Sequence, residues 1–257
     1  MNDLKKLAQQ VGTIAQAAGD QLLTFWRKPI EIEQKPQAGI VTQADIASEN
    51  FIIQELQKVE PGIAFWAEER GNLSQGASWC WVIDPLDGTT NFSRHIPYFC
   101  ISIALIHNGE PQLGVIYQPV TRELFVAYKN GGALYNGTRM IVSCRARQDY
   151  TIAVSFPYIE TPYGWCDPNI ATIWPDVFEV RYIGAAALDL AYTAAGRFDA
   201  AFFRRIAWWD IAAGVILIQE AGGVATEFDG SPLTSDYQSL VAGGPGAVTW
   251  LQSKLKL

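Results

Sequence analysis

The stretch 79–92, WCWVIDPLDGTTNF, constrains the fold of this chain more than any other part of the sequence. Residues 79–83 form an apolar run, which predicts a buried strand that ends at Asp84. Pro85 has no backbone N–H to donate to a neighbouring strand, so we expect the chain to turn at this residue. The polar residues that follow should therefore lie at the end of a strand.

Two carboxylates follow the predicted strand at close spacing. Asp84 ends the strand, Asp87 comes three residues later, and Gly88 then permits a tight backbone. Residues 89–91 are Thr, Thr and Asn, which are types that cap the start of a helix. Carboxylate oxygens suit a hard cation such as Mg²⁺, and free N–H groups at a helix start suit a phosphate. The alternative is a surface turn without a ligand, because Asp-Pro and Asp-Gly are common in turns.

The string DPLDGTTNF at 84–92 resembles the first signature of the inositol monophosphatase family. A second string, WDIAAG at 209–214 followed by EAGG at 220–223, is similar to the second signature of that family. By position alone, Asp210 in this string would be the N-cap of a helix. Members of the family are Mg²⁺-dependent, lithium-sensitive phosphatases of small phosphate monoesters. The resemblance covers essentially the full length and implies a phosphoric monoester hydrolase.

The resemblance also implies roles for individual residues. The implied ligands for two or three Mg²⁺ ions are Glu68, Asp84, the Leu86 carbonyl, Asp87 and Asp210. The implied catalytic residues are Glu68 and Thr89, which orient the attacking water, and Asp45, which accepts a hydrogen bond from Thr89. The implied substrate contacts are Gly88, Thr89, Thr90, Gly184, Ala186 and Asp210. The residues alone leave simpler roles open, namely a helix cap at Asp45, a solvated strand end at Glu68 and close packing at 184–187.

Hydrophobic periodicity predicts the remaining elements. Helices are expected over 4–26, from near Thr42 or Asp45 to 59, over 185–195, over 209–221 and at the C-terminus, with a loop at 28–40. Strands are expected at 63–67, 99–106, 113–117, 123–128, 133–135, 151–156, 223–227 and 239–243, while 157–176 has no assignable pattern. Asn-Gly at 108–109 predicts a hairpin within an antiparallel meander.

The fold that the resemblance implies is an α/β (α+β) layered αβαβα sandwich. We expect an N-terminal α+β half at 1–148, with an antiparallel sheet and the first signature. A C-terminal α/β half at 149–257 would complete the active site.

Composition limits the class of protein. A formal net charge of −7 argues against a general nucleic-acid surface, and 49% hydrophobic residues support a packed core. The four cysteines, Cys80, Cys100, Cys144 and Cys166, lack metal-binding spacing, and Cys80 and Cys100 are expected to be reduced core thiols. The N-terminus has no signal-peptide pattern and no apolar run is long enough to cross a bilayer, so we predict a cytoplasmic protein without a membrane partner.

The substrate stays open at this stage. Inositol-specific members of the family carry a Glu that binds sugar hydroxyls, and the matching position here is Phe203, followed by Arg204 and Arg205. The two arginines either contact a second anionic group or are simply exposed. Inositol 1-phosphate or a related sugar or polyol phosphate is expected. Related branches hydrolyse fructose 1,6-bisphosphate, histidinol phosphate or 3′-phosphoadenosine nucleotides, and TTNF favours the inositol-type branch. A non-catalytic metal-binding regulatory protein is the alternative from another class, and a homodimer is the family expectation.

Overall fold

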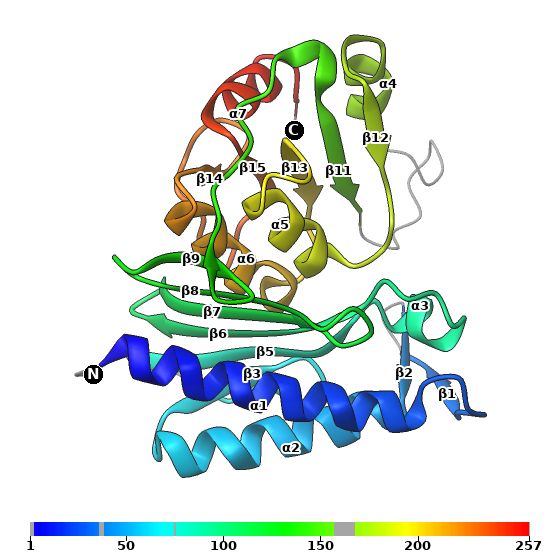
Figure 1. Cartoon of the computed structure of the whole chain (residues 1–257), viewed down its shortest axis with the longest axis vertical. Helices are drawn as coiled ribbons and strands as arrows, with labels where there is room; N and C mark the ends of the chain where they lie inside the picture. Colours follow the sequence, from blue (N-terminus) through cyan, green and yellow to red (C-terminus); the bar gives the residue numbers. More distant parts are fainter. Residues whose placement is uncertain (1–2, 36–38, 75, 157–167, 257) are drawn as a thin grey trace.

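The computed structural model describes residues 3–35, 39–74, 76–156 and 168–256. These residues form alternating layers of helices and sheet in the order αβαβα (Figure 1). The layered sandwich that we expected is therefore confirmed.

Two long helices form the first layer, at the bottom of Figure 1. They are α1 (Leu4–Phe25) and α2 (Gln43–Val59). Asp3 caps α1 by accepting a hydrogen bond from the backbone N–H of Lys6 at 2.9 Å. The apolar stripe of α1 is buried, with Val11 and Leu22 fully inaccessible, because it packs against the neighbouring sheet.

The first sheet is an extended meander with one parallel pair. Its strands are β3 (Ala64–Ala67), β4 (Gly71–Asn72), β5 (Trp79–Asp87), β6 (Cys100–His107), β7 (Glu110–Gln118), β8 (Glu123–Tyr128), β9 (Gly132–Tyr135) and β10 (Thr138–Arg139), in the order β10-β9-β8-β7-β6-β5-β3-β4. Only β3 and β5 pair in parallel among them. Trp81 and Ile83 pack towards α1 and α2, whereas Val82 packs on the opposite face, so both faces of β5 are buried.

The second sheet and its helices complete the layers. The strands are β11 (Thr151–Ser155), β12 (Glu179–Arg181), β13 (Ala200–Arg204), β14 (Val224–Thr226) and β15 (Ser239–Gly243), in the order β12-β11-β13-β15-β14. Helices α5 (Ala186–Ala194) and α6 (Trp208–Glu220) lie between the two sheets. Helices α4 (Pro168–Ile173) and α7 (Pro245–Gln252) cover the outer face, and short 3₁₀ turns occupy Arg147–Asp149 and Trp174–Asp176.

One buried cluster joins the parts on either side of the expected boundary at 148. It runs from Val82 on β5 through the α5 and α6 side chains to Ala201 and Phe203 on β13. Each sheet lies within one of the two halves, but the halves share this core. The division into 1–148 and 149–257 stays a prediction.

Three sequence predictions of local structure were wrong. The chain does not turn at Pro85, because β5 continues through it to Asp87 as a bulged strand. The expected loop at 28–40 contains β1 (Ile32–Gln34), which pairs with β2 (Ile40–Thr42); the side chains of β1 are exposed, so no buried face produced a signal. Thr89, Thr90 and Asn91 do not cap the next helix, α3 (Thr89–Ser93), which begins after Gly88 in a left-handed conformation without a side-chain cap.

Other predictions fare differently. Cys80 and Cys100 are buried free thiols, as expected, and Cys166 lies outside the described residues together with most of the unassigned stretch 157–176. Strands β12 and β13 had no counterpart among the predicted elements.

Within the described residues, none of the helices combines the length and apolar character that crossing a membrane requires.

Candidate active site

A β-bulge brings the two carboxylates of the first signature to the same side of the sheet. Asp84 pairs with Ser102 and Asp87 pairs with Cys100, so β5 advances by one residue more than β6 between these pairs. Residues three apart in a regular strand point to opposite faces, and the extra residue corrects this alternation. Pro85 suits the bulge because it has no N–H to leave unpaired, and its carbonyl accepts a hydrogen bond from Ser48 at 2.9 Å.

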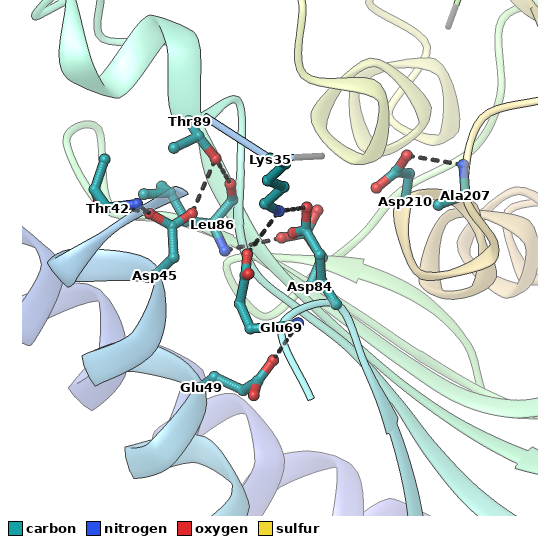
Figure 2. Close-up of polar contacts among 11 residues, drawn as sticks. Lys35, Thr42, Asp45, Glu49, Glu69, Asp84, Leu86, Thr89, Ala207 and Asp210 are labelled. Atoms are coloured by element: carbon teal, nitrogen blue, oxygen red, sulfur yellow. Dashed lines mark hydrogen bonds and ion pairs between the residues drawn. The ribbon is translucent and has the colours of Figure 1, made fainter. Parts of the chain in front are cut away.

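Asp210, from the second half of the chain, lies close to Asp84 and Asp87. It lies in the first turn of α6, where its carboxylate accepts a hydrogen bond from the Ala207 N–H at 3.1 Å (Figure 2). Asp210 is therefore not the N-cap that its position suggested, because Ala207 is the N-cap and Asp210 lies at the third position of the helix. Asp210 also lies close to Asp84 and Asp87. One carboxylate oxygen of each of these three residues lies within 4.8 Å of the others. Ser102 on β6 donates to the Trp209 carbonyl at 3.2 Å, which fixes the start of α6 against the first sheet.

The three carboxyl groups disfavour one another's ionisation. Burial raises the pKa of Asp84 well above its usual range, and the charges of Glu68, Asp87 and Asp210 raise it further. Burial raises the pKa of Asp87 to about 6, although the N–H groups of Ala187 and Leu188 donate to it and oppose the shift. Removal from bulk water, followed by the charge of Asp87, raises the pKa of Asp210. Three acids held this closely fit a hard divalent cation, whose charge would remove the repulsion.

Glu68 lines the same pocket, but its carboxylate forms an ion pair with Lys35. Lys35 Nζ lies 2.5 Å from Glu68 Oε1 and 2.7 Å from Glu69 Oε1. Burial alone would lower the pKa of Lys35, but the two glutamates hold it above its usual value. Glu69 is thus the second partner of Lys35, and its backbone N–H donates to Glu49 at 2.8 Å (Figure 2). The structure gathers Asp84, Asp87 and Asp210 into one group and leaves Glu68 at its edge.

Asp45 combines both roles that the sequence allowed. Its Oδ2 accepts hydrogen bonds from the Thr42 N–H at 2.8 Å and the Thr42 hydroxyl at 2.6 Å, which closes a capping box at the start of α2. Its Oδ1 lies 2.9 Å from the Thr89 hydroxyl, which also lies 3.0 Å from the Leu86 carbonyl. Asp45 is fully buried, and this burial raises its pKa to about 7. The Leu86 N–H donates to Asp84 at 2.9 Å, so the bulge links this pair to the carboxylate group.

The expected substrate-contact residues also lie at the pocket. Gly88 has φ of 90°, and a Cβ there would meet the Tyr98 carbonyl at 3.0 Å, so glycine is required on both counts. Thr90 lies in the first turn of α3, Gly184 precedes α5, and Ala186 begins α5. The pocket has a volume of about 730 Å³ and contains Gly88, Thr89, Thr90, Gly184, Ala186 and Asp210 in its lining, together with Glu68, Asp84, Leu86 and Asp87.

Asp45 and Phe203 lie outside the pocket lining. Among the described contacts, Asp45 is linked to the pocket by its hydrogen bond with Thr89. Phe203 is fully buried in the core between β13 and the helices α5 and α6. An apolar ring in the core offers nothing to a substrate hydroxyl.

Sequence analysis missed two residues of the site. Lys35 lies in a polar stretch whose composition matches that of any surface loop, so nothing indicated its contact with Glu68. Glu49 lies one turn after Asp45 on α2, and it is 2% exposed. A second carboxylate four residues after Asp45, on the same face of the predicted helix, is the sequence signal that could have identified it.

Comparison with known proteins agrees with this geometry. The sequence model of the Inositol monophosphatase family matches residues 3–255, so the chain belongs to that family, whose members are phosphoric monoester hydrolases. It is 41% identical over 217 residues to "Inositol-1-monophosphatase" of Mesorhizobium japonicum, covering 83% of this chain and 82% of the relative. It is 37% identical over 247 residues to "Nus factor SuhB" of Escherichia coli, covering 94% and 92%. The solved inositol monophosphatase of Anabaena superposes with a TM-score of 0.87 at 36% identity, covering 98% of this chain and 95% of that structure.

Proposed function

We propose that this chain hydrolyses a small phosphate monoester in a Mg²⁺-dependent reaction, with inositol 1-phosphate or a related sugar or polyol phosphate as the substrate. The observation that carries this proposal is the group formed by Asp84, Asp87 and Asp210, with mutual oxygen distances within 4.8 Å in a pocket of about 730 Å³. Asp84, Asp87, Asp210, Glu68 and the Leu86 carbonyl would hold two or three Mg²⁺ ions. Bound Mg²⁺ supplies positive charge that favours ionisation of water and neutralises phosphate oxygens.

The residues of the chain itself would orient the nucleophile. The Thr89 hydroxyl has one hydrogen to donate, and two acceptors lie within reach of it, the Asp45 carboxylate and the Leu86 carbonyl. Its lone pair is thereby left to accept a hydrogen from a water molecule in the pocket, while Glu68 accepts the other hydrogen. The oxygen of that water then faces the phosphorus for in-line attack.

The phosphate and the leaving group would be held on other sides of the pocket. Backbone N–H groups at 88–90 would bind phosphate oxygens, and Gly184 and Ala186 would contact the substrate. A water molecule near Asp210 would protonate the departing alkoxide. Lys35 would leave Glu68 when a metal ion binds there, because two cations at one carboxylate repel each other.

The test is phosphate release from a panel, with and without Mg²⁺ and with added lithium. The panel contains inositol 1-phosphate, fructose 1,6-bisphosphate, histidinol phosphate, 3′-phosphoadenosine 5′-phosphate and glycerol 2-phosphate. Mg²⁺-dependent turnover inhibited by lithium is the expected result. Retained Mg²⁺ binding without turnover of any compound would instead support the non-catalytic regulatory protein, an alternative that the relative named Nus factor SuhB keeps open.

The homodimer and the cytoplasmic location stay predictions of the same proposal. Light scattering on the purified chain measures the first, and cell fractionation measures the second.

A further inference from the structure

Three consecutive residues at the end of β13 have three different environments. Phe203 is buried in the core. Arg204 donates to the Lys256 carbonyl, and its guanidinium lies 5.5 Å from the centre of the Phe228 ring, so it is directed to the C-terminal part of the chain. Arg205, by contrast, lines the pocket that contains the carboxylate group. The structure therefore separates two arginines that the sequence could only treat together.

The backbone at Arg205 adopts an uncommon conformation. Its φ is 47°, in the left-handed region that non-glycine residues seldom occupy, and its N–H donates to the Gln238 carbonyl at 3.2 Å. This turn connects β13 to α6 and lies five residues before Asp210. A residue held in a sparsely populated conformation beside a site is a reason to look for a function there.

The Arg205 side chain is exposed, and among the described residues it has no hydrogen-bond or ion-pair partner. Lys35 is the other cation in the described lining of the pocket, and it is already paired with Glu68 and Glu69. Arg205 thus provides the unpaired positive charge of this lining.

The rest of the described lining has no further carboxylate to offer a polyol. Every carboxylate among the described lining residues belongs to the metal group or to the pair with Lys35. The neighbouring surface includes Ile206, Trp209 and the rings of Phe156 and Tyr182, which stack with centroids 5.5 Å apart. Among these described residues, a leaving group with only hydroxyls would find no unengaged carboxylate to accept its hydrogen bonds, whereas an anionic one would find the Arg205 guanidinium.

We propose that Arg205 determines specificity by binding a second anionic group, a phosphate or a carboxylate, on the leaving-group side of the substrate. This inference rests on the proposed phosphatase function and names its substrate class. The planar guanidinium presents paired N–H donors that match the oxygens of either anion. Contact with a group remote from the reacting phosphate should act mainly on KM.

The experiment compares three substrates that differ in the leaving group. Glycerol 2-phosphate releases an uncharged alcohol, 3-phosphoglycerate releases a carboxylate, and fructose 1,6-bisphosphate releases a sugar that keeps a phosphate. The variants are Arg205→Gln, Arg205→Lys and the matched control Arg204→Gln, which removes an equal charge from the adjacent residue.

Arg205→Gln is expected to lower kcat/KM for an anionic leaving group about tenfold more than kcat/KM for glycerol 2-phosphate. Arg205→Lys should recover part of the loss, and Arg204→Gln should change the ratio by less than about twofold. A response with 3-phosphoglycerate alone identifies a carboxylate, and one with fructose 1,6-bisphosphate alone identifies a phosphate. The inference is wrong if Arg205→Gln leaves the ratio unchanged or if Arg204→Gln shifts it equally.

A binding measurement separates this inference from the proposed function. Calorimetric titration of the three compounds, with Ca²⁺ in place of Mg²⁺, gives dissociation constants without turnover. If none of the compounds is hydrolysed but Arg205→Gln still weakens binding of an anionic one about tenfold, the anion contact stands and the phosphatase proposal fails. Equal binding by the wild type and Arg205→Gln overturns the anion contact, whatever the activity.

Discussion

The Thr89 hydroxyl lies 2.9 Å from the carboxylate of Asp45, which belongs to a different helix 44 residues earlier in the chain. The same carboxylate closes the capping box of α2, so its position is fixed by two hydrogen bonds from Thr42. The orientation of Thr89 at the pocket therefore depends on how α2 begins. This relationship allows the role of the hydroxyl to be tested apart from that of the metal ligands.

Removing the Thr89 hydroxyl should reduce turnover without unfolding the chain. Thr89→Val keeps the branched shape but cannot orient a water, so we expect kcat to fall about 100-fold or more. Thr89→Ser keeps the hydroxyl and should lose less than about tenfold. Phosphate release and thermal unfolding of both variants measure this, and a Thr89→Val enzyme as active as Thr89→Ser would exclude the proposed role.

Asp84→Asn should abolish Mg²⁺-dependent turnover while leaving the fold intact. The substitution removes one of the three close carboxylates, so in EDTA the variant should unfold at a temperature no lower than the wild type. Asp20→Asn, an exposed change on α1, is the matched control. Full activity of Asp84→Asn, or failure of Mg²⁺ to raise the unfolding temperature of the wild type, would contradict the metal assignment.

Much of the fold could be predicted because its helices and antiparallel strands carry strong local patterns. The stripe on α1 and the Asn-Gly turn at 108–109 are examples, and both are found in the structure. Strands β12 and β13, which both pair in parallel with β11, could not be predicted in this way. β12 has only three residues, and β11 lies far from both strands in the sequence.

The two signature strings indicated which residues could form the site, but they did not predict how those residues are arranged in space. The acids at 84, 87 and 210 were found, but the bulge that places Asp84 and Asp87 on one side depends on pairing with β6. Lys35 was missed because its glutamate partners lie more than 30 residues away and their contact leaves no local pattern. The sequence matches Phe203 to the position of a Glu that binds sugar hydroxyls in inositol-specific members. The sequence did not show that this side chain is buried, because its burial depends on the packing of β13 on α5 and α6.

The metal-free protein should lose stability as the pH rises from about 4 to about 7. Asp45 has a pKa raised from 3.8 to about 7, mainly by burial, so in this window the folded chain keeps a proton that the unfolded chain has released. The free energy of unfolding therefore falls through the window, by on the order of a few kcal/mol. Urea unfolding in EDTA at several pH values measures this. Asp45→Asn should reduce the slope, and the raised pKa values of Asp84, Asp87 and Asp210 should account for the remainder. A slope unchanged in Asp45→Asn would show that Asp45 does not contribute to the pH dependence.

Glu49 should act as a positioning residue for the turn that carries Glu68. Its buried carboxylate accepts the Glu69 N–H at 2.8 Å and lies 3.5 Å from the Arg70 Nε, so it fixes the chain immediately after β3. Glu49→Ala leaves that N–H unpaired, and we expect the Mg²⁺ concentration for half-maximal activity to rise about 10- to 100-fold. Glu49→Gln keeps an oxygen acceptor and should shift it less.

Glu55→Gln on the same helix is the control for this prediction, because Glu55 pairs only locally, with Lys58 at 2.5 Å, among the described contacts. Activity is measured across a Mg²⁺ titration, with thermal unfolding as the check on folding. A merely structural role for Glu49 would lower the unfolding temperature and leave the Mg²⁺ dependence of the folded enzyme unchanged. A shift in the Mg²⁺ dependence that Glu49→Gln recovers would instead show that α2 orients Glu68 through Glu49. The same helix would then position two residues of the site, because it also orients Thr89 through Asp45.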